Sequence, residues 1–120
     1  MTDWRKQAAA GDVNAQWQLG LALANGRGVE KNDAEAVQWI RKAAEQGEVT
    51  AQINLGIAYA QGDGVPQNLS EAYLWWQVAS DLGNETATKN IKVIKKSMTA
   101  EQITEATRLA RAQLKKLPKE

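Results

Sequence analysis

The sequence predicts an all-α protein, a short α-solenoid of antiparallel helix pairs with about seven helices. Three observations support this fold class. All nine glycines recur at a spacing of 36 residues, and residues 11–46 match residues 47–82 at 16 of 36 positions without a gap. Within each unit, apolar residues follow helical spacing twice. A repeat period of about 20 to 50 residues is typical of solenoids and arrays.

Each unit begins with a predicted helix that has a narrow apolar stripe. The stripe follows i, i+4, i+7, i+8 spacing, at Ala15, Leu19, Ala22 and Leu23 and again at Ala51, Leu55, Ala58 and Tyr59. Two glycines one residue apart then end the helix and reverse the chain, at Gly26 and Gly28 and at Gly62 and Gly64. Gly20 and Gly56 lie within these helices, where glycine costs about 1 kcal/mol relative to alanine, so we expect close helix packing there.

The second helix of each unit starts with the pattern N-x-x-E. Asn32 and Asn68 are the predicted caps, and the glutamate three residues later is expected to reach back to the cap. The predicted buried faces are Ala36, Trp39, Ile40 and Ala43 in the first unit and Ala72, Trp75, Trp76 and Ala79 in the second. We interpret Trp39 and Trp75 as core residues. Trp76 is also expected in the core, with an outer contact around Tyr73 and Trp76 left open.

The two ends of the chain depart from the repeat. Residues 3–10 resemble the last turns of a second helix without its partner, and Trp4 is expected to cover the open end of the first pair. Residues 83–117 read as a divergent closing helix pair that lacks the double-glycine loop and starts its last helix with a capping box at Thr99. We therefore expect one solenoid domain over residues 1–120, with full units at 11–46 and 47–82.

The composition excludes several kinds of chemistry. The chain has no His and no Cys, so it offers no imidazole base, no thiolate nucleophile and no zinc site of the usual nitrogen and sulfur ligands. The carboxylates are scattered over predicted caps and loops. We therefore expect no catalytic residues, no metal, no cofactor and no enzymatic activity.

Two sequence features bear on the compartment. No apolar run approaches the roughly 18 residues of a membrane span, and the residues after Met1 lack the regions of a signal peptide. We expect no membrane contact and a cytoplasmic protein, or a periplasmic one if Met1 replaces a removed signal peptide.

The repeated motif resembles a known family. The segments 15–20, 26–29 and 39–44 (AQWQLG, GRGV and WIRKAA), with their copies after Ala51, are similar to the Sel1-like repeat, a relative of the tetratricopeptide repeats. The resemblance is specific over residues 11–82. Leu23 departs from the family's usual Tyr, and residues 77–80 depart from its R-K-A-A pattern. The resemblance implies a right-handed superhelix of helix pairs that acts as a scaffold, binds other proteins on its concave side and has no catalytic activity.

The tetratricopeptide resemblance also places the concave face on five positions of each first helix. They are Asn14, Trp17, Leu21, Ala24 and Asn25, then Thr50, Ile53, Ile57, Ala60 and Gln61, then Thr86, Lys89, Val93, Lys96 and Ser97. Five of these form an apolar strip, here called the groove strip: Trp17, Leu21, Ile53, Ile57 and Val93. Asn25, Gln61, Lys89 and Lys96 border it. An exposed apolar patch with a polar rim is typical of a protein contact. Packing between helices and docking of a second copy remain alternatives.

Charge is distributed unequally along the chain. Residues 1–82 hold 6 basic and 10 acidic side chains, a net charge of −4, whereas residues 83–120 hold 9 and 4, a net charge of +5. The basic end is either a solvated cap or a contact for an acidic protein. Nucleic acid is not expected, because the basic end has no aromatic residue for base stacking.

The favoured function is a non-catalytic interaction module or adaptor that holds a partner protein or peptide in the groove. The alternative is an inhibitor or immunity-type protein that masks one enzyme or toxin. A homodimeric scaffold is the third reading, and a monomer is favoured over a dimer.

Overall fold

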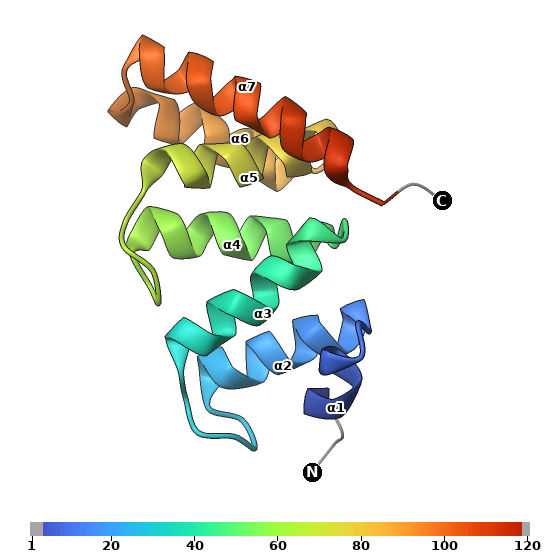
Figure 1. Ribbon diagram of the computed structural model, residues 1–120. Coiled ribbons are helices and arrows are strands. Elements are labelled where there is room, and N and C mark those ends of the chain that lie inside the picture. Colours follow the sequence, from blue (N-terminus) through green and yellow to red (C-terminus); the bar gives the residue numbers. More distant parts are fainter. Residues whose placement is uncertain (1–3, 119–120) are drawn as a thin grey trace.

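The computed structural model describes residues 4–118, which form seven α-helices, one 3-10 turn and no strand (Figure 1). The helices are α1 (Trp4–Ala9), α2 (Val13–Asn25), α3 (Asp33–Glu45), α4 (Val49–Gln61), α5 (Leu69–Asp81), α6 (Glu85–Ile94) and α7 (Ala100–Lys116), with the turn η1 (Lys95–Ser97) between the last two. The predicted all-α solenoid with seven helices is confirmed. None of the helices in residues 4–118 is long and apolar enough to cross a membrane.

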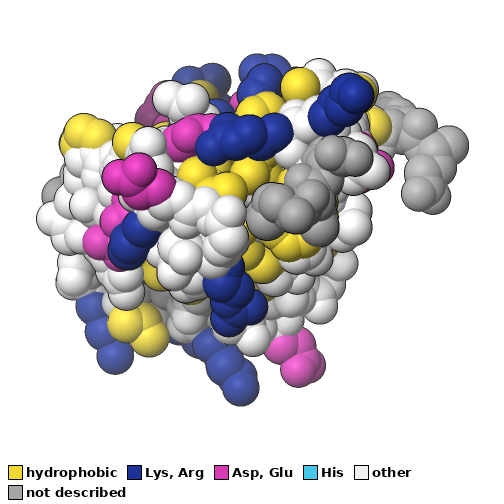
Figure 2. Space-filling model, turned by 90° about the horizontal axis from the view of Figure 1, so that it is seen from below, with side chains coloured by type: hydrophobic (Ala, Val, Ile, Leu, Met, Phe, Trp, Pro, Cys, Tyr) yellow, Lys and Arg dark blue, Asp and Glu magenta, His cyan; other side chains and the backbone are white. Residues whose placement is uncertain are grey.

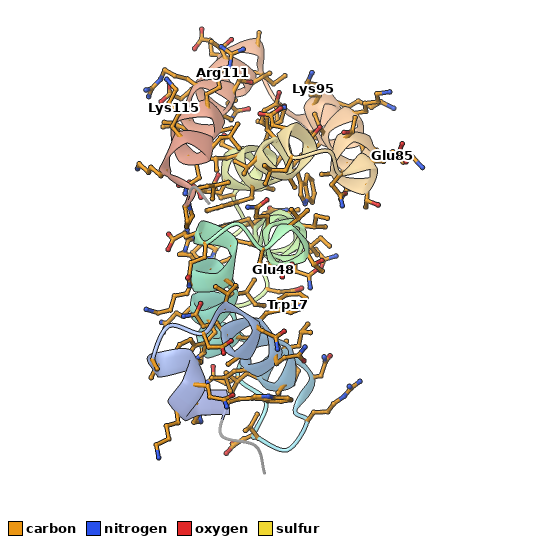
Figure 3. The ribbon with its side chains drawn as sticks, turned by 90° about the vertical axis from the view of Figure 1, so that its right-hand side faces the viewer. Trp17, Glu48, Glu85, Lys95, Arg111 and Lys115 are labelled. Atoms are coloured by element: carbon orange, nitrogen blue, oxygen red, sulfur yellow. The ribbon has the colours of Figure 1, made fainter. Side chains whose placement is uncertain are left out.

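The helices stack in chain order into an elongated body of 46 × 32 × 20 Å (Figure 1). Helices α2, α4 and α6 lie along one side of the stack, opposite α1, α3 and α7 (Figure 3). The helices within each of the first two units pack closely, α2 with α3 and α4 with α5. The closing pair differs, because α7 packs extensively against α5 and makes few contacts with α6.

The predicted helix starts are confirmed, with one correction. Asn32 Oδ1 accepts a hydrogen bond from Glu35 N, Asn68 Oδ1 accepts one from Glu71 N, and Thr99 forms a reciprocal capping box with Gln102. The expectation that Glu35 and Glu71 reach back to their caps is wrong. Asn32 N donates to Leu23 O instead, and Asn68 N donates to Tyr59 O. The carboxylate of Glu35 accepts hydrogen bonds from Arg5 and from the indole of Trp39, which lie outside the cap.

The repeated glycines have the two predicted roles. Gly26, Gly28, Gly62 and Gly64 have φ angles of 68°, 73°, 74° and 78°, the left-handed region in which glycine is favoured. Gly20 and Gly56 permit close helix packing. A Cβ atom on Gly20 would lie 2.6 Å from Ile40 Cγ1, and one on Gly56 would lie 2.3 Å from Trp76 Nε1.

The two equivalent tryptophans differ in burial. Trp75 is 1% exposed and lies in the core, as predicted. Trp39 is only half-buried at the edge of the core, with Lys42 Nζ 5.8 Å from its ring centroid, so its assignment as a core residue is wrong. Tyr73 and Trp76 are buried in a second cluster with residues of α6 and α7, which leaves no outer aromatic edge there.

Two buried glutamines tie each unit to the preceding helix. Gln16 Nε2 donates to Ala8 O and Gln52 Nε2 donates to Ala44 O, each at 3.1 Å. Helix α1 therefore meets α2 through the same contact by which the end of α3 meets α4. The expected covering role of Trp4 agrees with its half-buried position against the first core cluster.

The second of these glutamines lacks one partner. Gln46 Nε2 donates to Gln16 Oε1 at 2.8 Å, but the position 36 residues after Gln46 is Leu82, and Gln52 Oε1 is buried without a hydrogen bond. Leu82 itself is 45% exposed. The second unit thus carries an unsatisfied acceptor that the first unit does not.

Candidate functional site

The predicted groove positions lie on α2, α4 and α6, along one side of the stack, except Lys96 and Ser97, which lie in the turn η1 (Figure 3). All the polar ones are exposed: Asn14, Asn25, Thr50, Gln61, Thr86, Lys89, Lys96 and Ser97. The groove strip is less open than expected. Val93 is 67% exposed, whereas the other four strip residues are half-buried.

Packing between helices explains this partial burial. Trp17 lies against the first core cluster, between α2 and α4 in Figure 3, and Ile53 and Ile57 lie against the second cluster around Trp76. The groove strip is thus part core and part surface. An interrupted apolar surface with exposed polar borders remains along α2 and α4.

One open pocket of about 450 Å³ lies on this surface, between α2, α3 and α4. Three predicted groove residues line it together: Leu21, Asn25 and Ile57. Ala24, also a predicted concave position, lines it as well. The remaining predicted groove residues lie outside the pocket.

The floor and the rim of the pocket contain residues that the sequence analysis did not assign to a site. Val37 and Ile40 of α3, 5% and 6% exposed, form the floor. Lys31, Asp33 and Asp63 belong to the rim. One feature of the sequence could have indicated these floor residues. The residues 36 positions after Val37 and Ile40 are the much larger Tyr73 and Trp76, so the two units differ in side-chain volume there.

The second double-glycine loop closes one end of this pocket. A Cβ atom on Gly64 would lie 2.4 Å from Asp33 O and 3.0 Å from Val37 Cγ2, so the loop backbone rests directly on the start of α3. Both double-glycine loops lie on the same edge of the stack, at the left in Figure 1. The backbone contact at Gly64 therefore places Asp63 at the mouth of the pocket.

The rim carries more negative than positive charge. Lys31 Nζ forms an ion pair with Asp33 Oδ1 at 2.6 Å. No basic side chain in residues 4–118 lies within ion-pair distance of Asp63. The amide of Asn25 donates to Leu21 O in its own helix, at 3.0 Å, and its oxygen adds a neutral acceptor to the rim.

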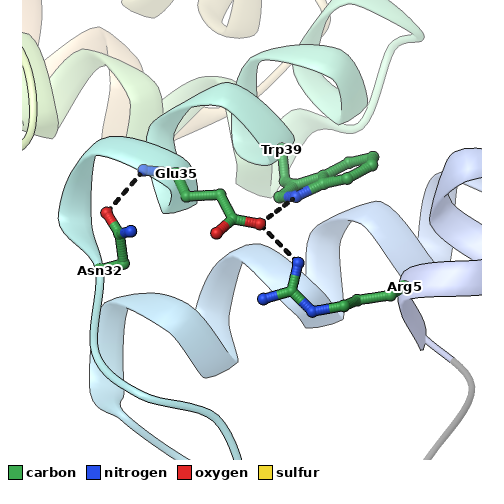
Figure 4. Close-up of polar contacts among 4 residues, drawn as sticks. All are labelled: Arg5, Asn32, Glu35 and Trp39. Carbon is green, nitrogen blue, oxygen red and sulfur yellow. Dashed lines mark hydrogen bonds and ion pairs between the residues drawn. The ribbon is translucent and has the colours of Figure 1, made fainter.

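A second polar cluster joins α1 to α3 (Figure 4). Glu35 Oε2 accepts hydrogen bonds from Arg5 Nη1 at 2.6 Å and from Trp39 Nε1 at 3.2 Å. The hydrogen bond from Arg5 is the main reason why the pKa of Glu35 lies below its ordinary value, and the Trp39 hydrogen bond lowers it further. This cluster fastens the short N-terminal helix and lies apart from the pocket-lining side of α4.

The two ends of the stack differ in character. At the C-terminal end, Lys95 projects from η1, and Arg111 and Lys115 project from α7 (Figure 3). Arg108 Nε donates to Glu105 Oε1 at 3.0 Å, which holds the pKa of Glu105 below its ordinary value. The N-terminal end shows hydrophobic, basic and acidic side chains together at its surface (Figure 2). The net charge of −4 in residues 1–82 and of +5 in residues 83–120 therefore belongs to different ends of the stack.

No group of three or more metal-ligating carboxylates occurs within residues 4–118. The arrangement that does occur is an apolar floor with a polar rim, which suits recognition of another molecule.

The model of the Sel1 repeat matches residues 13–48 and 49–84, a frame that starts two residues after each unit-opening glycine. The chain belongs to the Sel1 repeat family. Sel1 repeat proteins are generally protein–protein interaction modules and are typically non-catalytic.

Two solved Sel1 repeat structures are similar to this chain. One is a protective antigen present in uropathogenic Escherichia coli strains that displays an SLR fold, with a TM-score of 0.90 and 40% identity over 94% of this chain and 24% of that protein. The other is a Sel1 repeat protein from Oxalobacter formigenes, with a TM-score of 0.73 and 35% identity over 76% of this chain and 26% of that protein. The chain spans about a quarter of the length of either. No curated protein matches it.

Proposed function

We propose that this Sel1 repeat chain is a non-catalytic adaptor that holds a segment of a partner protein along α2 and α4. The observation that carries the proposal is the pocket between α2, α3 and α4, in which the predicted groove residues Leu21 and Ile57 meet above an apolar floor. Concave apolar sites with a few polar groups at the rim are the usual form of specific recognition sites.

The basic C-terminal end extends this proposal. Lys89, Lys96 and Arg111 are exposed, and residues 83–120 have a net charge of +5. An acidic region of the partner that meets this end would accelerate association through electrostatic steering.

We assign the repeats to residues 11–46 and 47–82 and the capping segments to residues 3–10 and 83–117.

The experiment compares two double variants with equal added charge. Leu21→Glu with Ile57→Glu places two carboxylates at the pocket, and Gln7→Glu with Gln38→Glu places two on exposed positions of α1 and α3. A partner captured from the source cell's lysate is identified, purified and titrated against each variant by calorimetry. We expect the pocket variant to lose binding and the control variant to keep it, with the helical circular dichroism of both unchanged.

Equal binding by both variants would contradict the groove proposal. In that case the basic end is tested next, by titrating the same partner against Arg111→Glu with Lys115→Glu. Light scattering during size-exclusion chromatography separates a monomer, which we expect, from a homodimeric scaffold.

A further inference from the structure

The pocket between α2, α3 and α4 is a consequence of small side chains at two positions and is not a general property of the repeat. Val37 and Ile40 form its floor in the first unit. At the corresponding positions of the second unit, Tyr73 and Trp76 are 3% and 7% exposed and pack with Ile57 in the second core cluster. The larger side chains thus fill in the second unit the space that the smaller ones leave open in the first.

The filled space is also closed by specific contacts. Trp76 Nε1 donates to Ile53 O at 3.0 Å, and the hydroxyls of Tyr73 and Thr107 are hydrogen-bonded to each other at 3.1 Å. Val37 and Ile40, at the equivalent positions of the first unit, have no indole or phenol group to make these contacts. The open pocket therefore has room for an apolar side chain supplied by another molecule, in the place where the second unit supplies its own.

The rim indicates the charge of that molecule. Asp63 has no ion-pair partner in residues 4–118, and Asp33 is neutralised by Lys31, so the mouth of the pocket keeps one uncompensated carboxylate. A cation close to an exposed carboxylate gains modest Coulomb energy, whereas a second carboxylate there is repelled. The rim thus favours a basic over an acidic neighbour of the inserted side chain.

We propose that this pocket receives one large apolar side chain of a partner protein segment that carries a Lys or Arg close to it in sequence, with the cation at Asp63. The inference rests on the proposed groove function and adds the chemistry of the partner. The apolar side chain supplies most of the affinity, as buried anchors do in other interfaces, and the ion pair supplies selectivity.

The test uses a random peptide library displayed on phage and selected against the immobilised wild-type protein. We expect the enriched peptides to share an aromatic or large aliphatic residue next to, or a few positions from, a Lys or Arg. The best of them are synthesised, and their affinities for the wild type and its variants are measured by fluorescence anisotropy.

Two independent variants fill the pocket. Val37→Tyr with Ile40→Trp copies the second unit into the first, where Gly20 leaves the same close approach that Gly56 leaves for Trp76. Ala24→Leu fills the pocket from α2 by a single substitution. It keeps the test valid if the first variant does not fold. We expect each folded variant to bind the peptides about tenfold or more weakly. Leu82→Gln, a change of an exposed apolar residue outside both the groove strip and the pocket, is expected to leave the affinity unchanged.

Charge reversal tests the second part of the proposal. Asp63→Lys is expected to weaken the selected basic peptides about fivefold and to shift a new selection toward Asp and Glu. Peptides without a basic preference would overturn the assignment of the cation.

The outcomes separate this inference from the proposed function. Peptides that bind both pocket-filling variants as well as the wild type but are lost in Leu21→Glu with Ile57→Glu would overturn the pocket assignment and leave the groove function standing. A library that enriches no peptide contradicts both.

Discussion

The substitution Gly56→Ala tests the close packing of α4 against α5. A Cβ atom at this position would lie 2.3 Å from Nε1, 2.6 Å from Cδ1 and 2.8 Å from Cε2 of Trp76. All three atoms belong to one rigid indole, which is 7% exposed and fixed by its hydrogen bond to Ile53 O. The added methyl group therefore cannot be accommodated by a small rotation of a flexible chain end.

The expected cost follows from three contributions. Replacing glycine by alanine inside a helix stabilises the folded state by about 1 kcal/mol. Overpacking against the indole costs about 1–3 kcal/mol, and loss of the hydrogen bond from Trp76 Nε1 to Ile53 O costs about 1 kcal/mol. We therefore expect the free energy of unfolding to fall by about 1–3 kcal/mol. For a chain of this length, that corresponds to a melting temperature lower by about 4–12 °C.

Urea unfolding followed by circular dichroism measures this effect in two backgrounds. In Trp76→Ile, which copies Ile40 of the first unit, Gly56→Ala should cost much less, because the indole is absent. Gly20→Ala is the matched control in the first unit, where the nearest atom is Cγ1 of the more adaptable Ile40 side chain, and its cost should be smaller. An equal cost of Gly56→Ala with and without Trp76, or a gain in stability, would refute the packing argument.

Three further predictions concern single positions. Gly64→Ala should lower the free energy of unfolding by about 1–2 kcal/mol more than Gly62→Ala in urea titrations. Both glycines have positive φ, but only a Cβ atom on Gly64 would clash with a backbone carbonyl, 2.4 Å from Asp33 O. Leu82→Gln should raise the melting temperature by stabilising the fold by about 1 kcal/mol, since a Gln there can donate to Gln52 Oε1, and no rise would contradict the equivalence with the first unit. The pKa of Glu35 is lower in the folded protein than in the unfolded chain, so its stabilising contribution is present above about pH 4.5 and is lost as the pH falls through the lower folded value. As the pH is lowered, the free energy of unfolding should therefore fall less steeply in Glu35→Gln than in the wild type. Identical pH profiles would argue against the ion pair.

The features that could be predicted from the sequence are those that local rules determine. Caps at Asn32 and Asn68 and the left-handed glycines depend on neighbours within a few residues, and each occurs twice at the same spacing. The close approach at Gly20 and Gly56 could also be predicted, because glycine inside a helix requires a compensating contact. Because each of these local patterns occurs twice at a spacing of 36 residues, the two occurrences support each other's interpretation.

The features that the sequence did not predict depend on partners distant in the chain. The carboxylate of Glu35 has a local alternative at its cap, but Arg5, which is 30 residues away, provides a charged donor. Trp39 and Trp75 occupy equivalent positions, yet only Trp75 is fully buried. Helix α7 packs along α5 and adds leucines to the cluster that contains Trp75, whereas α3 packs mainly against α2 and α4. The number of neighbouring helices decides burial at such positions, and a helical pattern does not encode it.

Positions that are identical in the two units and positions that differ have different structural roles, as the pocket shows. Positions that match between the units, such as Leu19 and Leu55, build the common core and are 1% and 0% exposed. Positions that differ strongly in volume, such as Val37 and Tyr73, cannot fill the same space equally well, so one of the two units must either shift its helices or leave a cavity. The close packing of α2 on α3 at Gly20 shows that the helices have not moved apart there. The difference in volume therefore appears as open space between units, and the residues that border that space, above all Asp63, determine what enters it.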